Sequence, residues 1–324
     1  MAEGVYVFKE NGKEIFRSKN LITTRGSEII TSYLCGLNVQ WAGAVAVGCG
    51  TSSATAIDSM LNFEYSRTPI SSISPSYSYD STKGHNRITA KFLLSQDDVC
   101  DIYEVGLYPD TSNVAAGVGQ GQLLSSLSSS EPIYTFASTT GSTGPAAAVI
   151  YSGSYDETIN RIGTNSIKMT TTLAASYKNT FRHSGINLDL SDYSVADTIT
   201  LAGIKDTGTI TKFTVRFVTD DSNYYDYIIP TITDVFDTTY KIKSYTKGLW
   251  TAYGSPSWSN ITAIDFLVES ASAASVILDG IRINDVDTVN PNYALISRSV
   301  LSTPIIKSAG TDMEIEYYLN LDKS

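Results

Sequence analysis

The chain has 324 residues and a formal net charge of −10; 42% of its residues are hydrophobic and only 17% are charged. This length indicates two domains or three, and the scarcity of charged residues excludes an all-α fold with long surface helices. Lys and Arg form no cluster, which argues against nucleic acid as the main ligand. No apolar run approaches the roughly 20 residues of a membrane span.

The first twenty residues predict a short β-hairpin. Residues 5–8 and 14–17 are rich in apolar and aromatic side chains, as strands are. Between them, Asn11-Gly12 is the dipeptide that most strongly signals a tight turn between two strands.

Two short helices and one strand are expected next. Residues 25–34 place apolar side chains at helical spacing, and Thr24 precedes them as a cap. Residues 41–47 predict a small apolar strand. Residues 51–61 predict a second short helix, with its apolar side chains on the inner face.

The middle of the chain predicts a strand pair followed by a domain border. Residues 87–94 and 99–108 alternate as two paired strands would, and the polar residues 96–98 supply the turn between them. Gly, Ser, Ala and Thr then dominate residues 110–147. A compact domain rarely contains so long a loop, so we interpret this segment as a linker.

The second half of the chain predicts a β-sandwich or jelly roll. Short strands separated by polar turns follow one another at regular spacing, which is typical of these folds. The predicted strands are 165–171, 197–203, 212–219, 224–230, 240–245, 261–269 and 275–284. Residues 292–321 return to the alternating style of the first part.

Three segments resemble the virion proteins of tailed phages. The first is NLITTRGSEIITSYLCG with VAVGCGTSSATAIDSMLNFEYSRTPISS, and the second is RITAKFLLSQDDVCDIYEVGLYPD, with Glu104 opening a Glu-x-Gly-Leu motif. The third is LISRSVLSTPIIKSAGTDMEIEYYLNL, in which Arg298, Pro304 and Lys307 form an Arg-x5-Pro-x2-Lys motif. In such proteins the three parts form one β domain of the tail, fibre or baseplate.

The order of these segments implies a discontinuous architecture. A virion-docking β domain with two short helices would comprise residues 1–140 and 288–324, with a second domain inserted at 145–287. The insert resembles the galactose-binding-like jelly roll of carbohydrate-binding modules, on the segments GTNSIKM, WSNITAIDF and VILDGIRI. We therefore expect a mainly β protein made of a β-sandwich-type outer domain and an inserted β-sandwich.

The sequence offers little for catalysis. His85 and His183 are its only histidines, which leaves few bases for a nucleophilic triad. The carboxylates of the insert supply an alternative, a two-carboxylate glycosidase whose cleft they would line. They are Asp220, Asp221, Asp226, Asp234 and Asp237. The favoured interpretation is polar loop residues on an acidic protein, with no catalytic residue.

The resemblance to jelly-roll modules implies one structural calcium ion and no required cofactor. Its ligands would come from an early loop and the last strand, with Asp156 or Glu157 and Asp279 as candidates. Carboxylates are the hard oxygen donors that Ca²⁺ prefers. The alternative is that Asp279 simply ends a strand.

Aromatic residues of the insert suggest a glycan site. Trp250 and Tyr253 occupy GLWTAYGSPS, a stretch that predicts an exposed loop. Trp258 precedes a strand, so we expect it in the core. Sugar rings stack on exposed aromatic faces, and the alternative for these side chains is ordinary packing between strands.

These observations lead to three functional hypotheses. The first is a non-enzymatic virion component of the tail, baseplate or fibre attachment, with other virion proteins as partners and a symmetric homo-oligomer on the particle. A capsid decoration protein is the alternative within this class. A protein that binds a host surface glycan is the second hypothesis, and a depolymerase is the third. The expected location is the virion, after synthesis in the host cytoplasm.

Overall fold

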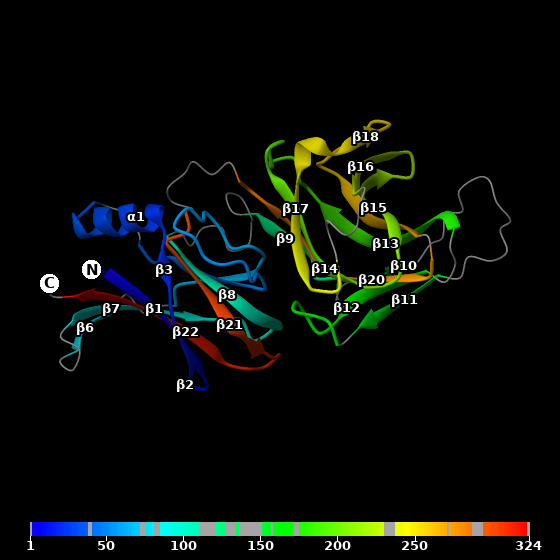
Figure 1. Ribbon diagram of the computed structural model, residues 1–324. Coiled ribbons are helices and arrows are strands. Elements are labelled where there is room, and N and C mark those ends of the chain that lie inside the picture. Colours follow the sequence, from blue (N-terminus) through cyan, green and yellow to red (C-terminus); the bar gives the residue numbers. More distant parts are fainter. Residues whose placement is uncertain are drawn as a thin grey trace. The chain divides into compact units, whose positions relative to one another are not determined.

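The computed structural model describes residues 2–37, 41–71, 76–80, 85–109, 121–127, 134–135, 151–156, 158–171, 175–229, 237–270, 272–286 and 294–322. The chain divides into two compact units. Unit 1 comprises Met1–Gly121 and Thr288–Ser324, and unit 2 comprises Gln122–Asp287. Strands make up most of both units (Figure 1), so the predicted mainly β, sandwich-type fold is confirmed.

Unit 1 is a sandwich of two five-stranded antiparallel sheets. Sheet A has the order β2 (Lys13–Lys19), β1 (Ala2–Glu10), β22 (Met313–Asp322), β7 (His85–Leu93) and β6 (Ser76–Asp80). Sheet B has the order β3 (Leu21–Ile22), β21 (Ser297–Lys307), β8 (Cys100–Tyr108), β4 (Ala44–Gly48) and β5 (Glu64–Pro69). Apolar side chains of both sheets form one core cluster.

The N-terminal hairpin and the first helix agree with the sequence. Strands β1 and β2 pair across Asn11 and Gly12, whose φ angles of 49° and 78° suit the turn that matches strand twist. Helix α1 (Thr24–Leu34) follows, capped by Thr23 rather than Thr24 because the Thr23 hydroxyl accepts the Gly26 N–H. Ile29 and Ile30 of α1 contribute to the core of the unit.

The second predicted helix is wrong. Residues 51–61 form turns and irregular backbone. Asp58 closes one of these turns, since its carboxylate accepts hydrogen bonds from the N–H and hydroxyl of Thr55, at 3.0 and 2.5 Å. The segment has helical spacing, but its backbone is committed to bonds with other parts of unit 1.

The predicted pairing of 87–94 with 99–108 is also wrong, although both strands exist. Strand β7 pairs with β22 and β6 in sheet A, whereas β8 pairs with β21 and β4 in sheet B. The connection between β7 and β8 therefore crosses from one sheet to the other. Alternation identifies a half-buried strand, but it does not distinguish a neighbour in the same sheet from a partner across the sandwich.

A buried glutamate fixes the loop that replaces the second helix. Glu104 on β8 is fully buried. Its Oε1 atom accepts the N–H groups of Gly50 and Phe63, at 3.0 and 2.8 Å, and its Oε2 atom accepts that of Asn62 at 3.0 Å. Oε2 also accepts hydrogen bonds from Nε and Nη2 of Arg298 on β21, at 3.0 and 2.6 Å.

Arg298 extends the same network and is 3% exposed. Its Nη1 atom donates to Asp58 at 2.7 Å, and its Nη2 atom donates to the carbonyl of Ser52 at 3.1 Å. The loop is thus held by backbone and side-chain bonds to one ion pair between two strands. A buried ion pair of this kind becomes costly when one partner is removed.

Unit 2 is a second β-sandwich. Sheet C has the order β11 (Tyr151–Asp156), β12 (Ser166–Thr171), β20 (Ala274–Asn284), β14 (Thr198–Thr207) and β17 (Lys241–Thr246), and β9 (Gln122–Ser125) also pairs with β20. Sheet D has the order β10 (Tyr134–Thr135), β13 (Ala175–Leu188), β19 (Ile261–Ser270), β15 (Ile210–Asp220), β16 (Asn223–Ile229) and β18 (Thr251–Tyr253). A short 3₁₀ helix, η2 (Lys247–Leu249), links β17 to β18.

All seven strands predicted within the insert are present, and the structure adds a long one, β13. Its polar sequence with Gly185 resembles a turn region, yet it pairs with β19 over most of its length, with two register shifts. Strand β9 lies within the segment interpreted as a linker and pairs with β20. Unit 2 therefore begins at Gln122, earlier than the expected 145.

Removing one partner of the buried Glu104–Arg298 pair should lower the free energy of unfolding more than removing one partner of an exposed ion pair. Glu104→Ala removes one of the two carboxylates that pair with the buried Arg298 and leaves three loop N–H groups without their acceptor, so we expect a loss of about 3–5 kcal/mol in the free energy of unfolding. Glu14→Ala removes the exposed partner of Arg17 and should cost less than about 1 kcal/mol. Urea unfolding of the full chain measures both. Equal losses in the two variants would contradict the role assigned to Glu104.

Candidate functional site

The outer face of sheet D has a row of alternating charges that runs across four strands. Arg182 on β13, Asp265 on β19, Arg216 on β15 and Asp226 on β16 are direct cross-strand neighbours in the ladder. We call these four residues the charged row. Aromatic and aliphatic side chains of the same strands, such as Phe217, belong to the core cluster, because successive side chains of a strand point to opposite faces.

Both arginines of the charged row make two-pronged contacts with carboxylates. Arg182 donates from Nε and Nη2 to Asp265, at 2.7 and 2.9 Å. Arg216 donates in the same way to Asp226, at 2.6 and 2.9 Å. The hydrogen-bonded Asp265 carboxylate raises the pKa of Arg182, so this guanidinium stays charged. The row is formally neutral, and its arginine side chains keep 30% and 19% exposure.

Two tyrosines lie beside the charged row. Tyr224 on β16 and Tyr253 on β18 are cross-strand neighbours with ring centroids 5.0 Å apart and ring planes at 26°. The guanidinium carbon of Arg216 lies 3.6 Å from the Tyr224 centroid. Because β15 and β18 flank β16 on opposite sides, Tyr224 lies between Arg216 and Tyr253. Tyr253 is 42% exposed and offers the free aromatic surface of this stack.

This arrangement combines two modes of recognition. An exposed phenol ring stacks on the apolar C–H face of a flat ligand, and its hydroxyl hydrogen-bonds at the edge. Guanidinium groups held by buried carboxylates present N–H donors in fixed directions. A neutral ligand with many hydroxyl groups and one apolar face matches both.

The structure corrects the placement predicted for Trp250. Its indole is 8% exposed and belongs to the core, where its centroid lies 5.0 Å from that of Phe217. The expectation of an exposed loop residue is therefore wrong. The 3₁₀ turn of η2 directly precedes Trp250. The backbone N–H of Trp250 donates to the Lys247 carbonyl at 3.2 Å. The Gly and Ser residues around Trp250 suggest an exposed loop and give no sign of this 3₁₀ turn.

The other two aromatic predictions have different outcomes. Trp258, expected in the core, is half-buried and packs against the core cluster, and it stacks on Tyr225 with centroids 4.0 Å apart and ring planes at 9°. Tyr253 is exposed, as expected. It lies on a short strand rather than in a loop.

Sequence reasoning did not find the charged row. Of its members, only Asp226 belongs to the acidic residues of the glycosidase alternative. A usable signal exists in the strand 212–219, where Arg216 interrupts an apolar run between Val215 and Phe217. The partners of that arginine depend on strand register, which the sequence pattern leaves open.

The acidic residues of the predicted cleft have hydrogen-bond partners wherever the structure describes them, and Asp221 accepts Arg182 Nη1 at 3.2 Å. Asp226 is bound to Arg216, Asp220 accepts bonds from its own turn, and Asp237 accepts the N–H and hydroxyl of Thr239. Asp234 lies outside the described residues. Of the histidines, His183 is 1% exposed, and nothing is described of the His85 side chain.

Asp279 on β20 has one oxygen available for a further interaction. The carboxyl is fully buried, its Oδ2 atom accepts the Arg161 N–H and the Tyr240 hydroxyl, at 2.7 and 2.5 Å, and its Oδ1 atom has no hydrogen-bond partner. Burial raises the pKa of Asp279 to about 7. The side chains of Asp156 and Glu157 lie outside the described residues, and no group of three metal-binding side chains occurs among those described.

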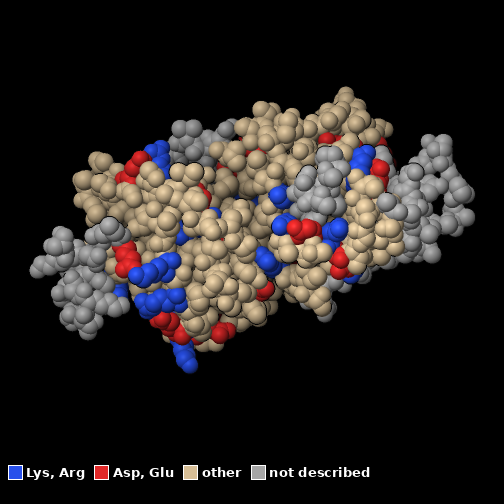
Figure 2. Space-filling view, in the orientation of Figure 1, with Lys and Arg blue, Asp and Glu red and all other residues tan. Residues whose placement is uncertain are grey.

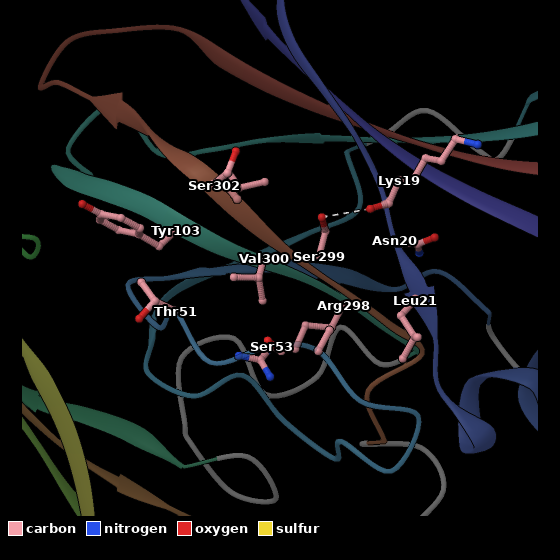
Figure 3. A pocket seen from close by; sticks show the side chains of 12 residues that line it. Lys19, Asn20, Leu21, Thr51, Ser53, Tyr103, Arg298, Ser299, Val300 and Ser302 are labelled. Carbon is pink, nitrogen blue, oxygen red and sulfur yellow. Dashed lines mark hydrogen bonds between the residues drawn. The ribbon is translucent and has the colours of Figure 1, made fainter.

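Unit 1 has a polar pocket of about 600 Å³ on sheet B (Figure 3). Its walls come from the end of β2 and β3, the loop before β5, Tyr103 of β8 and the start of β21. The Ser299 hydroxyl donates to the Lys19 carbonyl at 3.1 Å across one side. The residues lining it are Lys19, Asn20, Leu21, Thr51, Ser53, Ala54, Tyr103, Arg298, Ser299, Val300, Leu301 and Ser302.

The surface shows charges of both signs side by side. In Figure 2, Lys and Arg atoms adjoin Asp and Glu atoms, and no broad basic area covers the described part of this face. Among the described residues, no helix is long and apolar enough to cross a membrane.

About half of the chain is similar to solved carbohydrate-binding modules. The family 11 module of the cellulosomal cellulase Lic26A-Cel5E of Clostridium thermocellum matches with 14% identity and a TM-score of 0.37, covering 50% of this chain and 93% of that one. The family 30 module of cellulase Cel9D-Cel44B of the same organism has 14% identity and a TM-score of 0.34, covering 47% and 91%.

A glycoside hydrolase is similar only over a part. The glycoside hydrolase domain of Endo-D from Streptococcus pneumoniae matches with 15% identity and a TM-score of 0.29, covering 44% of this chain and 21% of that one. No protein-family model and no curated protein matches the sequence. Similarities this distant carry no argument about function, which rests on the site itself.

The two aromatic residues of the predicted glycan loop should differ in their effect on stability. Trp250→Ala empties a core position and should lower the free energy of unfolding by about 3–5 kcal/mol. Tyr253→Ala removes an exposed ring and should change it by less than about 1 kcal/mol. Thermal unfolding of the full chain followed by circular dichroism compares them. A Tyr253→Ala loss as large as that of Trp250→Ala would show that the ring is a core element.

Proposed function

We propose that the protein is a non-catalytic glycan-binding protein, and that unit 2 binds the glycan on the outer face of sheet D. The observation that carries this proposal is the exposed Tyr253 ring, which stacks on Tyr224 beside the charged row. The four formal charges of that row cancel. Aromatic stacking and fixed polar groups are the two features by which proteins orient sugars. Arginines bind the carboxylates of Asp226 and Asp265, and their own turns bind those of Asp220 and Asp237, which supports binding without hydrolysis.

The chemistry of the face favours a neutral glycan. Asp265 and Asp226 engage the arginines of the charged row, and Lys212 further along the face lies 3.3 Å from Glu269. A carboxylated sugar would have to compete with these protein carboxylates. A neutral sugar hydroxyl can instead accept from the partly exposed guanidinium groups without breaking either pair.

Unit 1 would attach the protein to a tailed-phage particle, in the tail, baseplate or fibre. The resemblance of its three segments to virion proteins supports this part of the proposal. Residues of all three segments line the pocket of unit 1, which suits the attachment of a partner there. Capsid decoration is the alternative location. A density map of particles carrying this chain, with symmetric copies on the tail or on the capsid, decides between them.

Glycan binding is tested by titration of the full chain with neutral and carboxylated oligosaccharides. We expect binding to a neutral member, such as a mixed-linkage β-1,3-1,4-glucan tetrasaccharide, with about tenfold weaker affinity in Tyr253→Ala. Tyr33→Ala is the matched control, since Tyr33 is 40% exposed but lies on α1 of unit 1. Absence of binding to every sugar would refute the proposal, and release of reducing ends from host polysaccharide would indicate a depolymerase instead.

We also propose a structural calcium ion held by Asp279 through Oδ1, together with Asp156 or Glu157. The orphaned oxygen supports the fit, because Ca²⁺ prefers carboxylate and other oxygen ligands. Without calcium, the buried carboxyl retains its proton up to about pH 7, whereas the unfolded chain releases it near its ordinary pKa of 3.8.

The sign of the pH dependence follows from that difference. The unfolding free energy of unit 2 should fall as the pH rises from about 4 to about 7, because folding then retains a proton that the unfolded chain has lost. Asp279→Asn should flatten this dependence. At pH 8, calcium should raise the melting temperature of the wild type over an EDTA control and leave Asp279→Asn unchanged. Fluorescence of Trp41→Phe, in which both remaining tryptophans belong to unit 2, reports the transition.

A further inference from the structure

The strand that presents Tyr253 is weakly held by its own ladder. Strand β18 has three residues, all exposed, and it forms the edge of sheet D. Its register with β16 comprises only three pairs, ending at Tyr224 opposite Tyr253. Short edge strands of this kind open easily, so the orientation of the Tyr253 ring requires support from outside the ladder.

Asn223 supplies that support through its side chain. Its Nδ2 atom donates to both carboxylate oxygens of Asp220, at 2.9 and 2.7 Å, and its Oδ1 atom accepts the Ser255 N–H at 2.6 Å. Asp220 is fixed in turn by the Ser222 N–H at 2.9 Å. These hydrogen bonds lower the pKa of Asp220, so it stays ionised. The amide thus links the β15–β16 turn to the residue two positions after Tyr253.

The glycine between Tyr253 and Ser255 makes this link possible. Gly254 has φ +70°, and a Cβ atom there would lie 2.3 Å from Asn223 Oδ1 and 2.5 Å from the Ser222 carbonyl oxygen. Only glycine combines that backbone conformation with so close an approach. A second link lies nearby, where the Ser257 N–H donates to the Thr219 hydroxyl at 3.0 Å.

We propose that Asn223 is a positioning residue for glycan recognition, which holds the Tyr253 ring against Tyr224 and ready to stack on a sugar. This inference rests on the proposed function of the sheet D face. Asn223 acts through the loop and makes no contact with the sugar itself. A ring fixed before binding loses less conformational freedom when the sugar arrives, which strengthens binding without a new contact.

The test uses the full chain and the mixed-linkage β-1,3-1,4-glucan tetrasaccharide as probe. Asn223→Ala should weaken binding by roughly threefold to tenfold, the range expected for partial loss of one aromatic contact. In a Tyr253→Ala background the same substitution should have no further effect. The double exchange Asp220→Asn with Asn223→Asp keeps an acceptor for Ser255 and an amide–carboxylate pair, so it should restore most of the affinity.

Nuclear magnetic resonance of the Tyr253 ring separates failure of this inference from failure of the proposed function. Asn223→Ala should shift the ring protons toward their values in an unstacked tyrosine, and the double exchange should return them. Unchanged ring signals, or an equal loss of affinity in the Tyr253→Ala background, would overturn the positioning role. If the wild type binds no sugar while the ring signals still shift, the glycan function is lost and the role of Asn223 in holding the ring stands.

Discussion

The buried pair of Glu104 and Arg298 is the interaction on which the arrangement of unit 1 depends. The two residues are 194 positions apart in sequence and lie on neighbouring strands of sheet B. Each side chain has hydrogen-bonding atoms that the other does not satisfy. Loop 49–63 supplies partners for them through its backbone N–H groups and Asp58. Once two charges are buried, their remaining hydrogen-bonding groups must be satisfied. That requirement fixes the two ends of the loop, at Gly50 and Ser52 and at Asn62 and Phe63.

Unit 2 uses paired charges on an accessible face of its sheet. Asp265 is buried beneath Arg182, while the arginines and the neighbouring tyrosines retain contact with solvent. Cross-strand pairing brings together side chains from four strands that no local segment contains. The same alternation that sends Phe217 into the core sends Arg216 to the outer face, so packing of the sandwich and construction of the candidate site are consequences of one strand register.

The edge of sheet D shows how a short strand becomes part of a binding face. Tyr253 belongs to a strand too short to hold a ring by its ladder alone, and Asn223 with Gly254 completes the support. None of these residues is buried in the core. Their effect depends on geometry that a rigid sheet provides, because β16 and the β15–β16 turn fix both ends of the contact.

The sequence by itself determined the fold class, the N-terminal hairpin, the first helix and seven strands of the insert. These are local properties: Asn11-Gly12 requires a specific turn, and alternation or apolar runs identify half-buried and buried strands. Tertiary structure alone decided that residues 51–61 are irregular, that β7 and β8 separate into two sheets, and that Trp250 is buried. It also brought Arg182, Asp265, Arg216 and Asp226 into one row. Each of these outcomes depends on which distant strands become neighbours. Hydrogen bonding and burial between segments far apart in sequence decide this, because they contribute more free energy than local conformational preferences do.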